Sequence, residues 1–258
     1  MINPELSNII EDIAEMEKRY RPNTTVARAM GGIAFNPFIG IPAAGKSTMI
    51  DELLKLYPSR YHFVKSRTTR PPKPGEDINA MHFLKSDRTA MEGMRDDVAN
   101  GEYVQFAVHP KTHAFYGTTL EDYDHNKMNL MPTLASTIDT LRNIGFRSVN
   151  PIVIVPEIAA WKRTFSNQIY SNSERHKRLQ EADASLAYCL KNRDDIEWVH
   201  NRHGAPDQTA RDIHSLLHGE LDDEELAARR NEAIAVGIRL RTQGVQRLLH
   251  RSREMARS

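Results

Sequence analysis

The residues with the clearest chemistry lie at positions 40–47, where the chain reads Gly-Ile-Pro-Ala-Ala-Gly-Lys-Ser. This is the complete pattern G-x-x-x-x-G-K-[ST]. Its glycines let the backbone curl so that several amide N–H groups point at one phosphate, and the following helix adds its positive end. Lys46 would then reach the β- and γ-phosphates, and the Ser47 hydroxyl would bind Mg²⁺. The motif predicts a nucleoside triphosphate site, with transfer of the γ-phosphoryl group as the reaction.

A second group of polar residues lies downstream, at positions 66–76. The chain reads Ser-Arg-Thr-Thr-Arg-Pro-Pro-Lys-Pro-Gly-Glu there. Hydroxyls and cations are well suited to bind phosphate oxygens. By itself the segment is equally well explained as a basic loop in solvent. Beside a phosphate-binding loop, it indicates a site for a second phosphorylated molecule.

The order of the motifs along the chain resembles that of the guanylate kinase family. Residues 66–76 resemble the family pattern S-x-T-T-R-x-P-R-x-G-E, and Phe-Tyr-Gly-Thr-Thr at 115–119 resembles Y-Y-G-[ST]. Lys-Arg-Leu at 177–179, followed by Ala-Tyr at 187–188, is similar to the helix that closes the family's lid. Asn201 matches a family asparagine near the adenine.

The resemblance covers residues 38–218 and implies a role for each matching residue. The ATP-binding residues would be Gly40, Ala43, Ala44, Gly45, Lys46, Ser47, Thr48 and Asn201, with Ser47 also a ligand of Mg²⁺. The acceptor-binding residues would be Ser66, Arg70, Lys73, Gln105, Tyr116 and Thr118. The catalytic residues would be Lys46, Arg178 and Arg175. These cations would neutralise charge on the transferring group, because positioning and electrostatics carry this reaction.

Departures from the family pattern cluster in the residues implied to bind the acceptor. Lys73 replaces a phosphate-binding arginine, which keeps the charge but loses the bidentate fork. The segment 77–83 is one residue short, so that Met81 or His82 stands where the family has a phosphate-binding tyrosine. Gln105 stands where a family glutamate accepts hydrogen bonds from N1–H and N2–H₂ of guanine. The sequence therefore indicates a kinase whose acceptor has changed.

Two further departures concern the metal and the lid. The strand expected at 129–134 lacks the family's aspartates. The second lid arginine is replaced around Asn167 and Gln168, and Arg163 or Arg175 would substitute for it. The donor motif itself is complete, whereas a scaffold protein derived from a kinase would more readily lose that motif first.

The elements that must position these residues follow from hydrophobic periodicity. Helices are predicted at 5–20, 46–56, 157–192 with a polar interruption, and 207–217, and strands at 38–39, 152–155 and 197–200. Pro37 is expected at the start of the first strand, because proline cannot donate to a central ladder. Between 64 and 124, short aromatic and β-branched pieces alternate with turn residues, which predicts a β-rich insertion.

The segment 222–258 begins with acidic residues and ends with many arginines, which suits the macrodipole of a helix. The residues expected to line its buried face are Ile234, Ile238, Val245 and Leu249. This helix would pack on the domain or on a second subunit. A nucleic-acid-binding tail is less favoured, because the arginines lack interleaved aromatics. Every motif lies before Leu221, so deletion of the tail is expected to leave nucleotide binding in place.

Composition sets the outer limits of the interpretation. Hydrophobic residues make up 40% of the chain and charged residues 27%, which is ordinary for a globular protein. Lys and Arg number 35 against 34 Asp and Glu, so no global charge favours nucleic acid or anionic membranes. The single cysteine, Cys189, excludes an internal disulfide and is expected in the core. With no signal-peptide pattern and no apolar run of membrane length, we expect a cytoplasmic protein.

Together these observations predict an α/β protein with the three-layer fold of P-loop NTPases, a parallel sheet, a β-rich acceptor-binding insertion and a helical lid. The expected domains are an N-terminal helical extension (1–30), a guanylate-kinase-like domain (31–219, insertion 64–124, lid 161–185) and a C-terminal charged helix (220–258).

The expected reaction is phosphoryl transfer from ATP, with Mg²⁺, to a nucleoside monophosphate of uncertain base. Two alternatives stay open: a P-loop kinase for another phosphorylated small molecule, and a nucleotide-dependent binding module without catalysis. Nucleotides are the expected partners. Membranes and nucleic acids are not, and a homo-oligomer through the terminal helices is an arrangement that the sequence allows.

Overall fold

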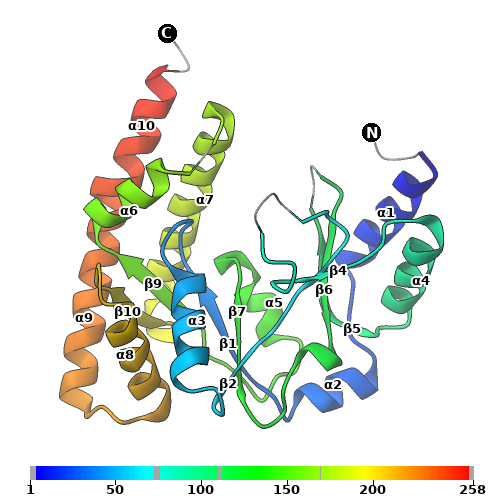
Figure 1. Cartoon of the computed structure of the whole chain (residues 1–258), viewed down its shortest axis with the longest axis horizontal. Coiled ribbons are helices and arrows are strands. Elements are labelled where there is room, and N and C mark those ends of the chain that lie inside the picture. The colour runs from blue at the N-terminus through cyan, green and yellow to red at the C-terminus, as the bar shows by residue number, and fades with distance from the viewer. Residues whose placement is uncertain (1–3, 73–75, 110–111, 169, 256–258) are drawn as a thin grey trace. The chain divides into compact units, whose positions relative to one another are not determined.

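The computed structural model (Figure 1) describes residues 4–72, 76–109, 112–168 and 170–255. Its contacts divide the chain into two compact units, and each is described by itself below. The P-loop unit comprises Asn36–Tyr61, Leu130–Asp139 and Asn150–Ser258. The β-insertion unit comprises Met1–Phe35, His62–Asn129 and Thr140–Val149.

The larger sheet carries the phosphate-binding loop. Its strand order is β10 (Glu197–Asn201), β9 (Ile152–Pro156), β1 (Ala34–Ile39), β7 (Met128–Pro132) and β2 (Tyr61–Phe63), with β8 (Ser148–Val149) also paired to β1. The β1–β9 and β10–β9 pairs are parallel, and every residue of β1 and β9 is buried. Continuous burial is typical of a parallel sheet covered on both faces. The α/β fold of P-loop NTPases with a parallel sheet is therefore confirmed.

The strand β1 is longer than predicted, and Pro37 lies inside it. Phe35 pairs in register with Val149 of β8, and Phe38 pairs with Ile152 of β9. Pro37 falls between these two paired stretches. The expectation that proline marks the start of the strand is wrong, because β1 pairs with β8 before the proline and with β9 after it.

The helices of the P-loop unit follow the predicted pattern closely. They are α3 (Lys46–Leu56), α6 (Ile158–Ser166), α7 (Asn172–Lys191) and α8 (Pro206–His218). A short α5 (Ile138–Arg142), which the sequence did not predict, begins in this unit and ends in the other. The polar interruption ends where Ser171 caps α7 in a capping box with Glu174. Cys189 is buried on α7, and this burial raises the pKa of its thiol to about 12, so the predicted core position is confirmed.

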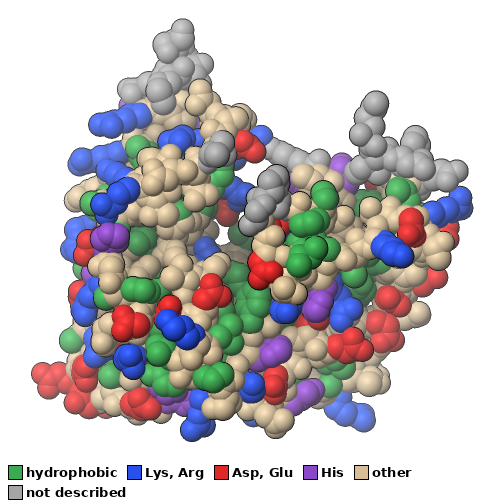
Figure 2. Space-filling view, in the orientation of Figure 1, with side chains coloured by type: hydrophobic (Ala, Val, Ile, Leu, Met, Phe, Trp, Pro, Cys, Tyr) green, Lys and Arg blue, Asp and Glu red, His purple; other side chains and the backbone are tan. Residues whose placement is uncertain are grey.

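The C-terminal segment forms α9 (Asp223–Arg239), a π-helical turn (Leu240–Val245) and α10 (Gln246–Met255). Figure 2 shows acidic side chains where α9 begins and basic ones further along, as the macrodipole favours. Ile238 is 44% exposed, so its predicted place on the buried face is wrong. Val245 and Leu249 are buried as predicted, and the buried residues of α9 are Ala233, Val236 and Gly237. Gly237 lies so close to the ring of Trp198 that a Cβ would be 2.5 Å from it.

The smaller sheet forms the centre of the β-insertion unit. Its order is β4 (His82–Phe83), β3 (Arg67–Thr68), β6 (Phe115–Thr119) and β5 (Tyr103–Val108), and the β5–β6 and β3–β6 pairs are antiparallel. The sequence missed α4 (Arg88–Ala99), a helix capped by Asp87 within the insertion. Its buried face consists only of Met91, Met94 and Val98, a sparse pattern among polar residues.

The N-terminal helix α1 (Pro4–Glu17) packs against this same sheet. Ile9, Ile10 and Ile13 of α1 form one core with residues of α4, β5 and β6, and α1 and α4 lie side by side in Figure 1. The Glu17 carboxylate accepts a hydrogen bond of 3.0 Å from the Val108 N–H. The short α2 (Thr24–Met30) follows. The N-terminal segment is thus part of the β-insertion core.

Within the described residues, no helix combines the length and the apolar character that a membrane crossing needs.

Candidate active site

The backbone of the phosphate-binding loop adopts conformations that require its glycines. Gly40 has φ +124°, and a Cβ there would lie 3.1 Å from the carbonyl oxygen of Ile154. Gly45 caps α3 with φ +92°, where a Cβ would lie 2.6 Å from Nδ2 of Asn201. Glycine adopts such positive φ values readily, whereas other residues do so at a cost. The loop therefore leads directly into the N-terminus of α3, where amide groups are available for an anion.

Lys46 lies folded over the loop. Its Nζ donates to the carbonyl oxygens of Gly40 at 3.3 Å and Ile41 at 2.9 Å. Burial lowers its pKa to about 8, while the carboxylate of Glu181 raises it and the charge of Arg178 lowers it further. The ammonium is therefore incompletely compensated by the protein. A phosphate group would supply the missing negative charge.

A cavity of about 560 Å³ opens beside the loop. It is lined by residues 43–49 of the loop and α3 and by residues 201–204 and Pro206 after β10. Pro156, Ala160, Trp161 and Thr164 complete the wall. Its size falls in the range typical of small-molecule sites.

Ser47 and Thr48 are exposed on the first turn of α3, within this cavity. Mg²⁺ at nucleotide sites usually has one or two protein ligands and completes its shell with phosphate oxygens and water. Among the described residues, no cluster of three or more His, Cys, Asp or Glu side chains is arranged to hold a metal. The accessible Ser47 hydroxyl fits a Mg²⁺ ion that is carried by a nucleotide.

Asn201 lies in the cavity wall, and its side chain forms a hydrogen bond with the phosphate-binding loop. Its Nδ2 donates to the carbonyl oxygen of Ala44 at 2.9 Å. Sequence reasoning missed a second such contact, in which Nε1 of the fully buried Trp161 donates to the Pro42 carbonyl at 2.9 Å. Two side chains from distant segments thus fix the carbonyls of the loop, so that its amides are free to turn toward a ligand.

The predicted lid arginines lie on α7. Arg178 forms an ion pair of 2.8 Å with Glu181, and its side chain is 47% exposed. The guanidinium of Arg175 lies over the ring of Phe165, 5.9 Å from its centroid. Arg163, the other substitute considered, places Nη2 at 3.2 Å from Nε2 of His203 in the cavity wall. Of these two candidates, it is Arg163 that contacts a residue of the nucleotide cavity.

The two faces of the smaller sheet carry different side chains. Phe106, Val108 and Phe115 point into the core beneath α1 and α4. Gly117 belongs to this face, because a Cβ there would lie 2.7 Å from the Phe115 ring.

The opposite face carries Gln105, Tyr116 and Thr118, since cross-strand pairs join Gln105 to Thr118 and Ala107 to Tyr116. Thr68 pairs with Tyr116 and so shares this face. Three predicted acceptor residues are thereby brought together. Gln105 lies inside β5 and not at its end, while Thr118 is completely buried, with its hydroxyl 3.0 Å from that of Tyr123.

Arg70 follows β3 and is held in place from several directions. Its guanidinium forms hydrogen bonds of 2.7 and 2.6 Å to the carboxylate of Glu76 and lies over the Phe83 ring at 5.4 Å. The hydrogen bond to Glu76 raises the pKa of Arg70, as does the nearby hydroxyl of Tyr116. Ser66 precedes β3, and its carbonyl accepts from the His82 N–H at 2.9 Å. Lys73 lies outside the described residues.

The structure distinguishes Met81 from His82 at the place of the family tyrosine. The sulfur of Met81 lies 3.3 Å from Nη2 of Arg70, whereas Nε2 of His82 lies 3.3 Å from Oδ1 of the buried Asp122. Met81 therefore stands beside the predicted phosphate-binding arginine. A thioether cannot donate a hydrogen bond to a phosphate.

Asn129 lies in the strand where the family pattern has aspartates that this sequence lacks, and its role is structural. It is completely buried, and its Nδ2 donates to the carbonyls of Ala34, Asp124 and Lys127.

Comparisons with known proteins show the family of this chain. The family model described as guanylate kinase matches residues 37–194. Guanylate kinase 1 of Arabidopsis thaliana is 30% identical over 183 residues, which cover 67% of this chain and 46% of that protein. The guanylate kinase of Sus scrofa is 31% identical over 116 residues, 45% of this chain and 56% of that protein.

The solved guanylate kinase of Anaplasma phagocytophilum has a TM-score of 0.46 at 19% sequence identity, covering 75% of this chain and 88% of that one. The chain spans about half the length of the curated relatives it matches. The family model, in contrast, extends over more than half of this chain and begins just before the phosphate-binding loop. The chain belongs to the guanylate kinase family.

Proposed function

We propose that this protein transfers the γ-phosphoryl group of ATP, as its Mg²⁺ complex, to a nucleoside monophosphate. The observation that carries the proposal is the cavity beside the phosphate-binding loop, where Lys46 and the exposed Ser47 face a space of about 560 Å³. Family membership supports the same reaction.

The proposed donor site needs little covalent chemistry from the protein. An oxygen of the acceptor phosphate attacks the γ-phosphorus, the bond to the β–γ bridging oxygen breaks, and ADP leaves. Loop amides and Lys46 hold the β- and γ-phosphates, and Arg178 balances charge on the group in transit. The bound Mg²⁺ would neutralise phosphate charge, with Ser47 as its protein ligand. The compensation of charge, together with positioning, supplies the catalysis.

The acceptor is proposed to bind on the face of the smaller sheet that carries Arg70, Tyr116 and Gln105. Arg70 is already oriented by Glu76, so a phosphate would add to a fixed guanidinium or displace that carboxylate. Gln105 is the proposed contact for the base. Its amide offers one donor and one acceptor, whereas guanine presents two donors on its N1 and N2 edge.

An ADP-release assay with GMP, AMP, CMP, UMP and a set of sugar phosphates tests the proposal. Turnover with any nucleoside monophosphate supports it and identifies the preferred base. Turnover with a sugar phosphate alone would replace it by a kinase for another phosphorylated small molecule, which the departures at Lys73, Met81 and Gln105 favour as the second candidate. Binding of ATP without turnover for any acceptor would leave a binding module.

A further inference from the structure

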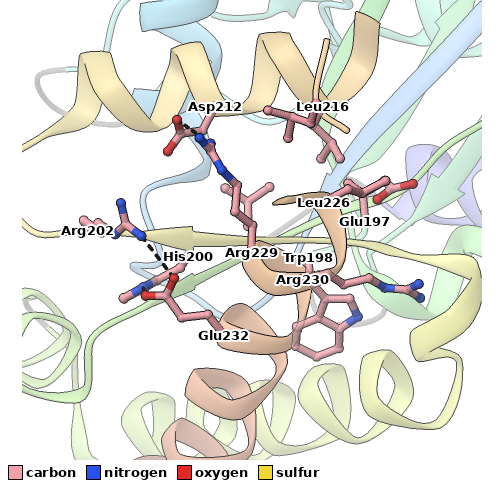
Figure 3. A pocket seen from close by; sticks show the side chains of 12 residues that line it. Glu197, Trp198, His200, Arg202, Asp212, Leu216, Leu226, Arg229, Arg230 and Glu232 are labelled. Carbon is pink, nitrogen blue, oxygen red and sulfur yellow. Dashed lines mark hydrogen bonds and ion pairs between the residues drawn. The ribbon is translucent and has the colours of Figure 1, made fainter. Parts of the chain in front are cut away.

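The C-terminal helix α9, which lies beyond the residues that match the family model, contacts a residue that lines the nucleotide cavity. Figure 3, a view of a different pocket that is lined by both Arg202 and Glu232, shows this contact. Glu232 of α9 accepts from Nη2 of Arg202 through Oε2 at 3.0 Å, and its Oε1 lies 3.0 Å from Nδ1 of His200. The single carboxylate therefore bridges two residues at the end of β10. One of them, Arg202, also lines the cavity beside the phosphate-binding loop.

The two residues that Glu232 bridges differ in exposure. The side chain of His200 is 12% exposed and that of Arg202 is 52% exposed. The hydrogen bond from His200 and the charge of Arg202 together hold the pKa of Glu232 below its usual value, so the carboxylate is charged at neutral pH. An exposed arginine has many rotamers, and a fixed carboxylate selects one of them.

The shape of the cavity assigns Arg202 a place on the nucleoside. The phosphates of a nucleotide belong at residues 43–49, where the loop amides and the N-terminus of α3 lie. The rest of the lining, which includes Arg202, is then available to the ribose and base. Asn201 is committed to the Ala44 carbonyl through its amide nitrogen. A planar guanidinium next to it is a suitable surface for stacking on an aromatic base.

We propose that Arg202 contacts the base of the donor nucleotide and that Glu232 is a positioning residue, which holds Arg202 in the wall of the cavity. The C-terminal helix is then part of the donor site, contrary to the expectation that residues after Leu221 are dispensable for nucleotide binding. The inference rests on the proposed function only in taking ATP as the ligand.

The contact can be tested by direct titration of the full chain with two probes, Mg²⁺–ATP and inorganic tripolyphosphate. The second probe has the phosphates and lacks the base. Glu232→Gln and Arg202→Ala should each raise the Kd for ATP about three- to tenfold and leave the Kd for tripolyphosphate within about twofold. The double variant should be no worse than Arg202→Ala alone, because both changes remove one contact.

Matched controls are available on the same helices. Glu224 is exposed in the first turn of α9, and the side chain of Arg211 on α8 is 51% exposed and outside the cavity lining. Glu224→Gln and Arg211→Ala should bind both probes as the wild type does. A general loss of structure in Glu232→Gln or Arg202→Ala would weaken the binding of both probes together. That result would overturn the inference.

The remaining outcomes separate this inference from the proposed function. Unchanged ATP binding by Glu232→Gln, or additive losses in the double variant, overturns the inference alone. A wild-type chain that shows the predicted pattern but transfers no phosphoryl group overturns the proposed function alone. A wild-type chain that binds tripolyphosphate no more weakly than ATP contradicts the assigned base contact.

Discussion

The P-loop unit and the β-insertion unit differ in the groups that would hold a phosphate under the proposed function. In the P-loop unit, the cradle is made of backbone, and its shape depends on Gly40 and Gly45 and on two side chains that bind loop carbonyls. In the β-insertion unit, the predicted contacts are single side chains on one face of a sheet. A backbone cradle tolerates few changes, whereas a side-chain contact can be exchanged residue by residue. The departures at Met81 and Gln105 lie in the second unit, as this difference would lead one to expect.

The two ends of the chain also contribute to different units. The helix α1 completes the core behind the smaller sheet, whereas α9 and α10 pack within the P-loop unit. Gly244 of the π-helical turn lies against Trp161, which in turn binds the loop carbonyl of Pro42. Changes in α1 and changes in α9 should therefore affect different substrates, and the predictions below exploit this separation.

The largest effect is expected at the donor site, from Lys46→Ala. Loss of this charge should lower kcat by at least about 10²–10³-fold, as removal of a single charge-stabilising group does. The thermal midpoint should change little, because the Nζ contacts only loop carbonyls. Lys55→Ala, which removes an exposed lysine from the same helix α3, is the matched control and should keep its activity. Near wild-type turnover of Lys46→Ala would disprove the kinase assignment.

Ile13→Ala should reveal the contribution of α1 to the β-insertion unit. Ile13 is completely buried, and truncation of such a residue typically costs about 2–5 kcal/mol of unfolding free energy. Urea titration measures the loss, and the KM for the acceptor should rise while the Kd for ATP stays unchanged. Ile238→Ala, at a position 44% exposed, should change stability by no more than about 0.5 kcal/mol. Equal losses in the two variants would show that α1 is not part of this core.

Gln105→Glu tests the base contact of the acceptor. A carboxylate accepts both guanine donors, whereas the amide of Gln105 leaves one mismatch, which costs about 1–3 kcal/mol when buried. The substitution should raise kcat/KM for GMP relative to AMP and CMP by roughly ten- to a hundredfold. Gln243→Glu makes the same change at an exposed position of the other unit and should not alter base preference. A strong GMP preference in the wild type, unchanged by the substitution, would show that Gln105 does not contact the base.

The smallest expected effect is a dependence of ATP binding on pH, and it concerns the P-loop unit alone. The pKa of Lys46 lies at about 8 without ligand, so above this pH the side chain is neutral in the free protein. ATP favours the charged form, and binding at pH 8.5 should therefore take up a proton, up to about one per nucleotide. The affinity for ATP should fall as pH rises through 8.

Calorimetric titrations in two buffers of different ionisation enthalpy measure this uptake. The variant Lys46→Met should lose it. Equal proton uptake in the variant would assign the uptake to another group. No uptake in the wild type would show that the protonation of Lys46 is not coupled to ATP binding.

Much of the donor site could be predicted because its information is local. The spacing of Gly40, Gly45, Lys46 and Ser47 implies a loop, a helix N-terminus and a phosphate site within eight residues. The helices α3, α7 and α8 lie where the sequence predicts helices. The helix α4 was missed although Met91, Met94 and Val98 stand at helical spacing, because the strand-like pieces on both sides of it led to a β-rich assignment for the whole segment. Pro37 misled for a different reason, since the interruption of the ladder depends on how β8 and β9 meet β1.

The sequence by itself thus determined the family, the fold class and the position of the loop that precedes α3. The tertiary structure alone decided which residues surround that loop. Trp161, Asn201 and Arg202 come to the nucleotide cavity from segments far along the chain, and Glu232 contacts Arg202 from a helix outside every motif. Such contacts depend on packing between distant elements, for which a linear pattern has no signature. The same reason explains why the structure, and not the sequence, places Met81 beside Arg70 and His82 beside Asp122.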